Sequence, residues 1–214
     1  MSDIKDQSAA QADDYTLTIF LYDGTVPGTE GFIEDINRQI LIHMSLDINF
    51  SGYDLVQWVD NIRRTRLRFD NAPIGHIIVL THGEPGMFNI GQEDDPETDV
   101  GAGITATEFA SMIYLELATD ALITLLCCET AATANGQALL RNITDRCQAT
   151  VIAADAVVNA GIRPNGQGVA ATTAGGIWRS RYLPSIGRTI VTRFMDPTAP
   201  GAQENIFPGL HSEL

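Results

Sequence analysis

The stretches HIIVLTHG (residues 76–83) and LITLLCC (residues 122–128) decide the fold. Each is a continuous apolar run that ends in side chains able to do chemistry, a histidine in the first and two cysteines in the second. Unbroken apolar runs are typical of strands that are covered on both faces, as in parallel sheets. The two stretches therefore predict neighbouring buried strands in a layered domain.

The rest of the chain alternates between strand-like and helix-like segments. Further strands are expected at 17–22, 150–158, 177–183 and 189–194, and a small hairpin around 86–91. Helices are expected over four ranges, followed by a Gly/Asn-rich loop at 159–176. The helices are 31–44, with His43 on its inner face, 53–69, 108–118 after a capping box from Thr105 to Glu108, and 135–147. This alternation predicts an α/β fold with three layers, a mostly parallel sheet of about six strands between helices.

Length and charge limit the classes of function. The 214 residues suit one domain over 15–195, with a flexible acidic tail at 1–14 and a C-terminal tail at 196–214. A formal charge of -14 disfavours nucleic acid and anionic membrane surfaces as partners. We find no secretory signal and no apolar run long enough to span a membrane. We expect a cytoplasmic protein, or one exported without a cleaved signal, and the three cysteines do not form a disulfide framework.

Reactive side chains follow three of the predicted strands. His82 and Gly83 come after the first quoted run, Cys127 and Cys128 after the second, and Asp155 after the strand at 150. In open α/β sheets, functional groups gather at the carboxyl ends of the strands. A histidine and a thiol at neighbouring strand ends are the parts of a cysteine nucleophile with its proton-transfer partner. Because side chains alternate between the faces of a strand, one cysteine faces the site and the other the core.

These residues resemble the caspase-like cysteine peptidases, a group that includes caspases, gingipains and clostripain. The similarity is highest to bacterial CHAT-type proteases and to the autoprocessing domains of large bacterial toxins. It lies in HIIVLTHGEPG followed by LITLLCCETA, two apolar blocks that end in His-Gly and in a small residue with Cys. The resemblance implies a caspase-like fold and an endopeptidase without a metal or organic cofactor. His82 would be the acid/base, Cys128 the nucleophile, the amides of Gly83 and Cys128 the oxyanion donors, and Cys127 a buried small residue.

The specificity pocket is less well determined by the sequence. Glu84, Asp155 and Arg179 are the candidate substrate-binding residues. Asp155 would favour a basic residue before the scissile bond, Arg179 an acidic one, and a pair between them would leave an apolar pocket. We rank the basic side chain first, then apolar, then acidic. The expected partners are a protein or peptide substrate and an activating protein, with proteolytic processing as the other means of activation.

Other interpretations remain open. The chain can be a non-catalytic caspase-like module that binds a partner, or a different thiol enzyme that uses Cys127 and Cys128. A zinc site is disfavoured because the two cysteines diverge and lack further ligands. Cys147 is expected in the core and His76 in a structural role. The toxin regulator inositol hexakisphosphate is not carried over to this acidic chain, where the arginines at 63–68 are its one conceivable site and an exposed helix face is the preferred account.

Overall fold

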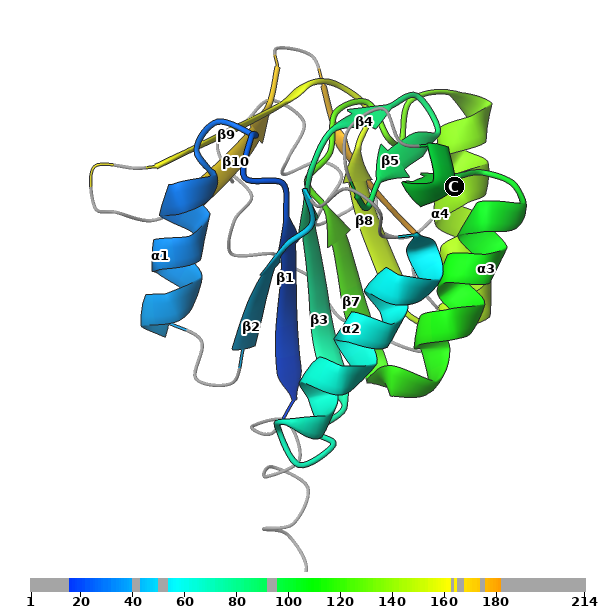
Figure 1. The fold of residues 1–214 in the computed structure, drawn as a ribbon. Coiled ribbons are helices and arrows are strands. Elements are labelled where there is room, and N and C mark those ends of the chain that lie inside the picture. The colour runs from blue at the N-terminus through cyan, green and yellow to red at the C-terminus, as the bar shows by residue number, and fades with distance from the viewer. Residues whose placement is uncertain are drawn as a thin grey trace, which may run out of the picture.

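A six-stranded sheet forms the centre of the computed structural model, in the order β11-β8-β7-β3-β1-β2 (Figure 1). All neighbouring pairs are parallel except the edge pair of β11 and β8. The strands are β1 (Leu17–Tyr22), β2 (His43–Asp47), β3 (Ile74–Leu80), β7 (Leu117–Leu125), β8 (Thr150–Ala154) and β11 (Trp178–Arg181). The structure describes residues 16–39, 43–49, 54–91, 96–162, 164, 168–173 and 176–181.

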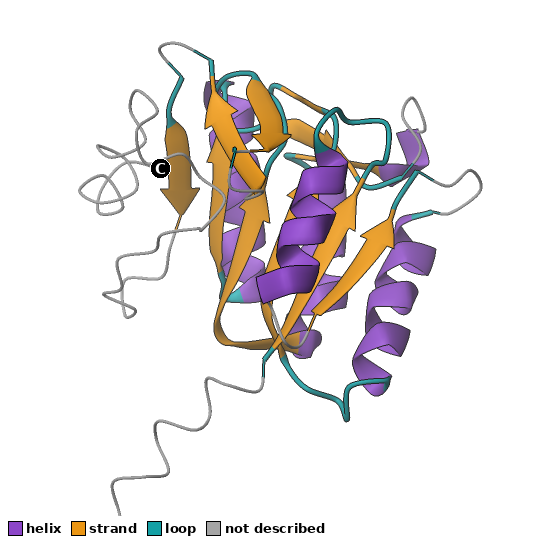
Figure 2. Cartoon of the chain, turned by 90° about the vertical axis from the view of Figure 1, so that its left-hand side faces the viewer, coloured by secondary structure: helices purple, strands orange, loops and turns teal. Residues whose placement is uncertain are grey.

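Helices cover both faces of this sheet, as the views in Figures 1 and 2 show. Helix α1 (Thr29–Gln39) and the hairpin of β9 (Val158–Ile162) and β10 (Gly168–Thr172) lie on one face. Helices α2 (Leu55–Leu67), α3 (Ile104–Ile113) and α4 (Thr133–Cys147) lie on the other. The three-layer α/β fold with a mostly parallel sheet of six strands is therefore confirmed.

Side chains of the central strands alternate between two hydrophobic cores. In β3, Ile77 and Val79 enter the core under α2, α3 and α4, whereas Ile78 and Leu80 enter the core under α1. Burial of each such side chain contributes about 1.5–3 kcal/mol to folding. Since both faces are occupied, the strand needs an unbroken apolar sequence, which is why HIIVLTHG has one.

A three-stranded antiparallel sheet follows β3 and sits at the carboxyl end of the main sheet (Figure 1). It consists of β4 (Gly83–Glu84), β5 (Met87–Asn89) and β6 (Asp99–Gly101), with a 3-10 turn at Pro96–Thr98. Phe88 of β5 packs edge-to-face on Phe109 of α3, with ring centroids 5.9 Å apart. This contact joins the small sheet to the core under α2, α3 and α4.

Helix α2 shows why its sequence forms a helix. The Asp54 carboxylate accepts the Gln57 N–H at 2.8 Å, and the Gln57 side chain accepts the Asp54 N–H at 2.8 Å, which completes a capping box. The buried stripe consists of Leu55, Trp58, Val59, Ile62 and Thr65.

One predicted helix end and one predicted helix start are wrong. The helix expected over 31–44 ends at Gln39, and His43 does not lie on a helix face but begins β2, paired with Thr18 of β1. The capping box at Thr105 is absent, since α3 begins at Ile104 without a side-chain cap. The Thr105 hydroxyl instead accepts the Gly101 N–H at 2.9 Å and ties β6 to the helix.

The other predicted elements have different outcomes. The predicted loop at 159–176 contains the β9/β10 hairpin, and the strand expected over 150–158 is divided into β8 and the start of β9. The helix expected over 108–118 ends at Ile113 and is followed by a 3-10 turn, Tyr114–Glu116. The strand expected at 189–194 and both predicted tails lie outside the described residues.

Candidate active site

The register of β3 and β7 brings His82 and Cys128 to the same level. Val79 pairs with Leu125, and the Leu126 N–H donates to the Val79 carbonyl at 2.7 Å. His82 and Cys128 each come three residues after this pair on adjacent parallel strands. The backbone of Gly83 passes close to that of Cys128, since a Cβ on Gly83 would lie 2.8 Å from the Cys128 carbonyl oxygen. Any side chain at this position would clash with the Cys128 backbone, so the residue directly after His82 has to be a glycine.

The two adjacent cysteines have different environments. Cys127 is fully buried in the core under α2, α3 and α4, with its sulfur 3.8 Å from the Val79 carbonyl oxygen. Burial raises the pKa of the Cys127 thiol far above its usual range. Cys128 is only half-buried, and its sulfur accepts the Val158 N–H at 3.4 Å. Cys147 is buried in α4 as predicted, and burial raises its pKa to about 12.

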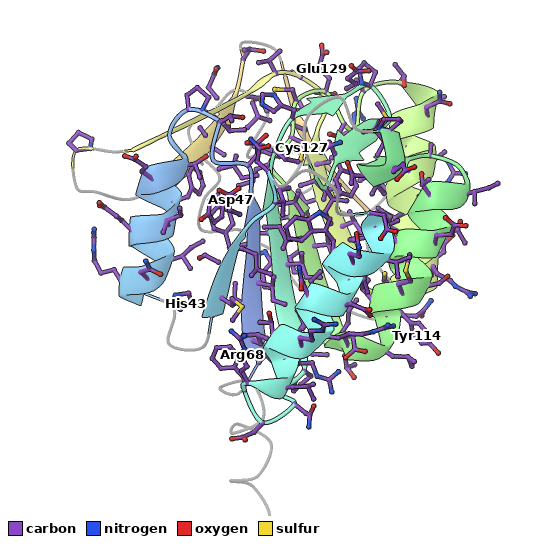
Figure 3. All side chains as sticks on the ribbon, in the orientation of Figure 1. His43, Asp47, Arg68, Tyr114, Cys127 and Glu129 are labelled. Carbon is purple, nitrogen blue, oxygen red and sulfur yellow. The ribbon has the colours of Figure 1, made fainter. Side chains whose placement is uncertain are left out.

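The turn after Cys128 is held from two sides. Glu129 adopts a left-handed conformation with φ of 53°, which is uncommon for a residue with a side chain. Its N–H donates to the Ala156 carbonyl at 2.9 Å, and the Gly86 N–H donates to the Thr130 carbonyl at 3.2 Å. Figure 3 shows Cys127 and Glu129 at the upper, carboxyl end of the central strands. The thiol of Cys128 thus projects from a turn that the main sheet and the small sheet fasten together.

The buried carboxylate of Asp23 lies next to the His82 imidazole. Asp23 is 1% exposed, and its Oδ2 lies 3.7 Å from Nε2 of His82 and has no hydrogen-bond partner. The other oxygen, Oδ1, accepts the Thr25 N–H at 2.8 Å, the Thr25 hydroxyl at 2.6 Å and the Asn49 amide at 3.2 Å. The Thr25 hydroxyl also lies 3.5 Å from Nε2. A carboxylate in this position can orient the imidazole ring.

Asp23 is not among the site residues predicted from the sequence, although the sequence carries a signal for it. Asp23 is the first residue after β1, and β1 is the neighbour of β3 in the sheet. The rule that reactive groups gather at the carboxyl ends of strands applies to β1 as well. The candidates predicted from strand ends follow β3, β7 and β8 only.

The small sheet orients the backbone of Gly83. The Asn89 N–H donates to the His82 carbonyl at 3.3 Å, which makes Gly83 and Phe88 a pair that exchanges no ladder hydrogen bonds. The N–H of a residue in such a pair points away from the partner strand. This geometry is compatible with the expected role of the Gly83 amide as an oxyanion donor.

Asp155 and Arg179 are paired with each other, one of the arrangements left open by the sequence. The Asp155 carboxylate accepts Nε of Arg179 at 2.9 Å and the Ile177 N–H at 2.7 Å. Their side chains are 17% and 30% exposed. Glu84 lies apart from this pair, at a cavity of about 210 Å³ that it shares with His82.

His76 and the arginines of α2 take part in contacts that support the fold. Nε2 of His76 lies 2.9 Å from the Thr124 hydroxyl, and burial lowers the pKa of His76 to about 4. Arg63 and Arg66 both bind Glu116, and Arg63 also donates to the Met112 carbonyl at 2.8 Å. These two arginines therefore join α2 to the end of α3.

Neither a cluster of metal-ligating side chains nor a membrane-spanning helix occurs in the described part of the chain. Among those residues, no three His, Cys, Asp or Glu side chains are grouped so as to hold a metal ion. None of the helices in the described ranges is long and apolar enough to cross a membrane.

Comparison with known proteins gives a family without an assigned activity. No curated protein matches the chain. The family model described as Domain of unknown function (DUF8616) matches residues 51–172, which is more than half of the chain and includes His82 and Cys128. The chain therefore belongs to the DUF8616 family.

Proposed function

We propose that the protein is a caspase-like cysteine endopeptidase with Cys128 as nucleophile and His82 as acid/base. The observation that carries the proposal is the line of side chains at the carboxyl ends of three adjacent strands. The half-buried Cys128 thiol follows β7, His82 follows β3, and the buried Asp23 carboxylate lies 3.7 Å behind the histidine. Such a nucleophile, base and orienting group form the recurring arrangement of thiol hydrolases.

The proposed reaction has two steps. The Cys128 thiolate attacks the scissile carbonyl, the C–N bond breaks, and protonated His82 gives its proton to the leaving amine. Water then attacks the carbonyl of the thioester, and His82 accepts a proton from that water. The C–S bond breaks, which returns the Cys128 thiolate and releases the product carboxyl group. In this scheme Asp23 holds the imidazole through Nε2, so Nδ1 is the nitrogen that exchanges protons with sulfur, amine and water. The amides of Gly83 and Cys128 would stabilise the oxyanion.

The preference for the residue before the scissile bond is revised by the paired charges. Arg179 neutralises Asp155, so neither of them attracts an opposite charge in this arrangement. Val157, next to the residue that contacts the sulfur, is 41% exposed and apolar. We propose that the residue before the scissile bond is apolar, ahead of a basic one.

Activation by a partner or by processing remains part of the proposal. The Cys128 sulfur rests against the backbone of Val158, 3.4 Å from its nitrogen and 3.8 Å from its oxygen. Val158 begins the β9/β10 hairpin, which packs closely against Gly28, the residue before α1, because a Cβ there would lie 2.8 Å from the Ala160 carbonyl oxygen. A partner that moves this hairpin would therefore move the group that holds the nucleophile.

The test is digestion of a proteome-derived peptide library by the wild type and by two cysteine variants. We expect cuts from the wild type, none from Cys128→Ala, and much of the wild-type activity from Cys127→Ala. Cleavage that survives Cys128→Ala and is lost in Cys127→Ala would contradict the assignment.

A labelling experiment separates the main alternative. A peptide-based electrophile should modify Cys128 in the wild type and leave Cys128→Ala unmodified. Absence of both labelling and cleavage, with and without candidate activators, would favour a non-catalytic module that binds partners. Unfolding of each variant in urea provides the control for a folded protein.

A further inference from the structure

The cavity beside His82 and the contact of the nucleophile belong to different parts of the structure. Besides His82, the cavity is lined by Gly83, Glu84, Met87 and Asp99, among others from β4, β5 and β6. The sulfur of Cys128 instead contacts β9, whose hairpin lies on the α1 face of the main sheet. In the proposed reaction, the amine departs on the side of the histidine that protonates it. The cavity therefore lies where the chain after the scissile bond would leave.

The size of this cavity suits one side chain. It encloses about 210 Å³, whereas pockets for drug-sized ligands enclose about 300–1,000 Å³. Met87 offers a flexible apolar wall, which can pack against the methylene groups of a long side chain.

The polar lining of the cavity carries negative charge. Among the described residues that line it, Glu84 and Asp99 are the two carboxylates, and none is a lysine or arginine. Asn89 donates to Oδ1 of Asp99 at 2.9 Å and to the Thr98 hydroxyl at 3.0 Å. Asn89 is itself buried, so these bonds fix the orientation of the Asp99 carboxylate before any ligand arrives. A preoriented carboxylate binds a cation without the cost of ordering it.

From this geometry we infer that the cavity is a substrate subsite for a lysine or arginine, placed first or second after the scissile bond. The inference rests on the proposed peptidase function and adds a specificity on the leaving-group side. In the arrangement that fits this lining, the apolar stem of the substrate side chain packs against Met87. Its cationic head lies between Glu84 and Asp99. The acidic lining would exclude Asp and Glu from the same position.

A binding experiment tests the subsite without requiring turnover. The protein is the full chain carrying Cys128→Ala, and the probes are labelled six-residue peptides with a free N-terminus. They begin with Lys-Lys, with two norleucines or with Glu-Glu and are otherwise identical. We expect the Lys-Lys peptide to bind about tenfold more tightly than the norleucine peptide, and the difference to shrink as salt rises from about 0.02 to 0.5 M.

Matched variants locate the effect. Glu84→Gln combined with Asp99→Asn should reduce the tenfold preference to less than about twofold, and Glu84→Lys should shift it toward the Glu-Glu peptide. Glu108→Gln removes one charge from an exposed position of α3 outside the cavity and should retain the preference. Equal affinity for the lysine and norleucine peptides, or a preference that survives the combined variant, would overturn the inference.

The library digest distinguishes failure of the subsite from failure of the proposed function. Wild-type cuts should be enriched in lysine or arginine at the first or second position after the cut. Cuts that depend on Cys128 but show no such enrichment would refute the subsite alone. If no cut depends on Cys128, the peptidase proposal fails, and the binding experiment still decides whether the cavity takes a cationic side chain.

Discussion

Replacement of Asp23 by asparagine is the most direct test of the proposed site. The three donors from Thr25 and Asn49 all bind Oδ1, so they hold the oxygen of the new amide in that place. The amide nitrogen then takes the position of Oδ2, 3.7 Å from Nε2 of His82. An N–H donor at this position opposes a protonated imidazole, which also carries hydrogen on Nε2.

The size of the effect follows from the distance and the exposure. A carboxylate and an imidazolium 3.7 Å apart attract each other by about 4 kcal/mol at an effective dielectric constant near 20. The His82 side chain is 43% exposed, so solvent screens much of this attraction. We expect Asp23→Asn to lose about 1–2 kcal/mol of stabilisation of the thiolate–imidazolium pair, which is a factor of about 5 to 30 in rate.

Alkylation by iodoacetamide measures this pair without a substrate. The reagent should report Cys128 in the folded protein, because Cys127 and Cys147 are buried. At about pH 6, where a thiol ionises only with help, we expect Asp23→Asn to react about 5 to 30 times more slowly than the wild type. Near pH 9, where thiols ionise unaided, the two rates should agree within about twofold.

Asp47→Asn provides the control for charge alone. Asp47 ends β2 near the same edge of the sheet (Figure 3), and its Oδ1 accepts the Asn49 N–H at 3.0 Å. This variant removes the same charge without changing the group that faces His82. Equal alkylation of Asp23→Asn and wild type at pH 6, with both proteins folded, would refute the role of Asp23. An equal loss of alkylation rate in Asp47→Asn would show that the effect of Asp23→Asn is a general effect of removing a negative charge.

The remaining predictions concern stability, measured by urea unfolding. Gly83→Ala should cost about 1–3 kcal/mol, because its Cβ would lie 2.8 Å from a backbone oxygen; Gly161→Ala in β9, with no atom within 4 Å of its Cβ, should lose less than about 0.5 kcal/mol. The pKa of His76 is about 4 when folded and near 6.5 when unfolded, so the unfolded chain binds more protons and stability falls as pH drops from about 6.5 to 4. The full shift in the pKa of His76 corresponds to about 3 kcal/mol of unfolding free energy. His76 is partly exposed, so we expect a loss of about 1–2 kcal/mol. His76→Gln should remove this part of the dependence of stability on pH. Asp155→Asn keeps an acceptor for the backbone but leaves Arg179 without its anion, so we expect a loss of about 1–2 kcal/mol, and no loss would show that the pair is too solvated to matter.

The apolar runs predicted the central strands because burial on both faces dictates their composition. Alternation of side chains along a strand predicted that only one of the two cysteines is buried, and the resemblance assigned that place to Cys127. In the structure Leu126 enters the core under α1 and Cys127 the opposite core, so Cys128 is the first residue beyond the packed layers. The local rule with a period of two limited the choice to one cysteine but did not say which.

Local rules failed where two structures fit one sequence. The isoleucines at 33, 36 and 40 fit the period of a helix, but His43 and the residues after it pair with β1 as an edge strand. An edge strand is only partly buried, so its sequence lacks the apolar run that marks a central strand. At Thr105, the hydroxyl can cap a helix or bind β6, and the position of the small sheet decides between them.

The order of strands explains the roles of the site residues better than any local pattern. Across the sheet, Asp155, Cys128, His82 and Asp23 follow β8, β7, β3 and β1, which are consecutive neighbours. A base that must reach both a nucleophile and a carboxylate has to follow the strand between theirs, and β3 lies between β7 and β1. Asp155 follows β8, on the side of β7 away from β3, and pairs with Arg179 of β11 instead. Each residue was visible in the sequence, but only the strand order determines which acidic residue lies beside the histidine.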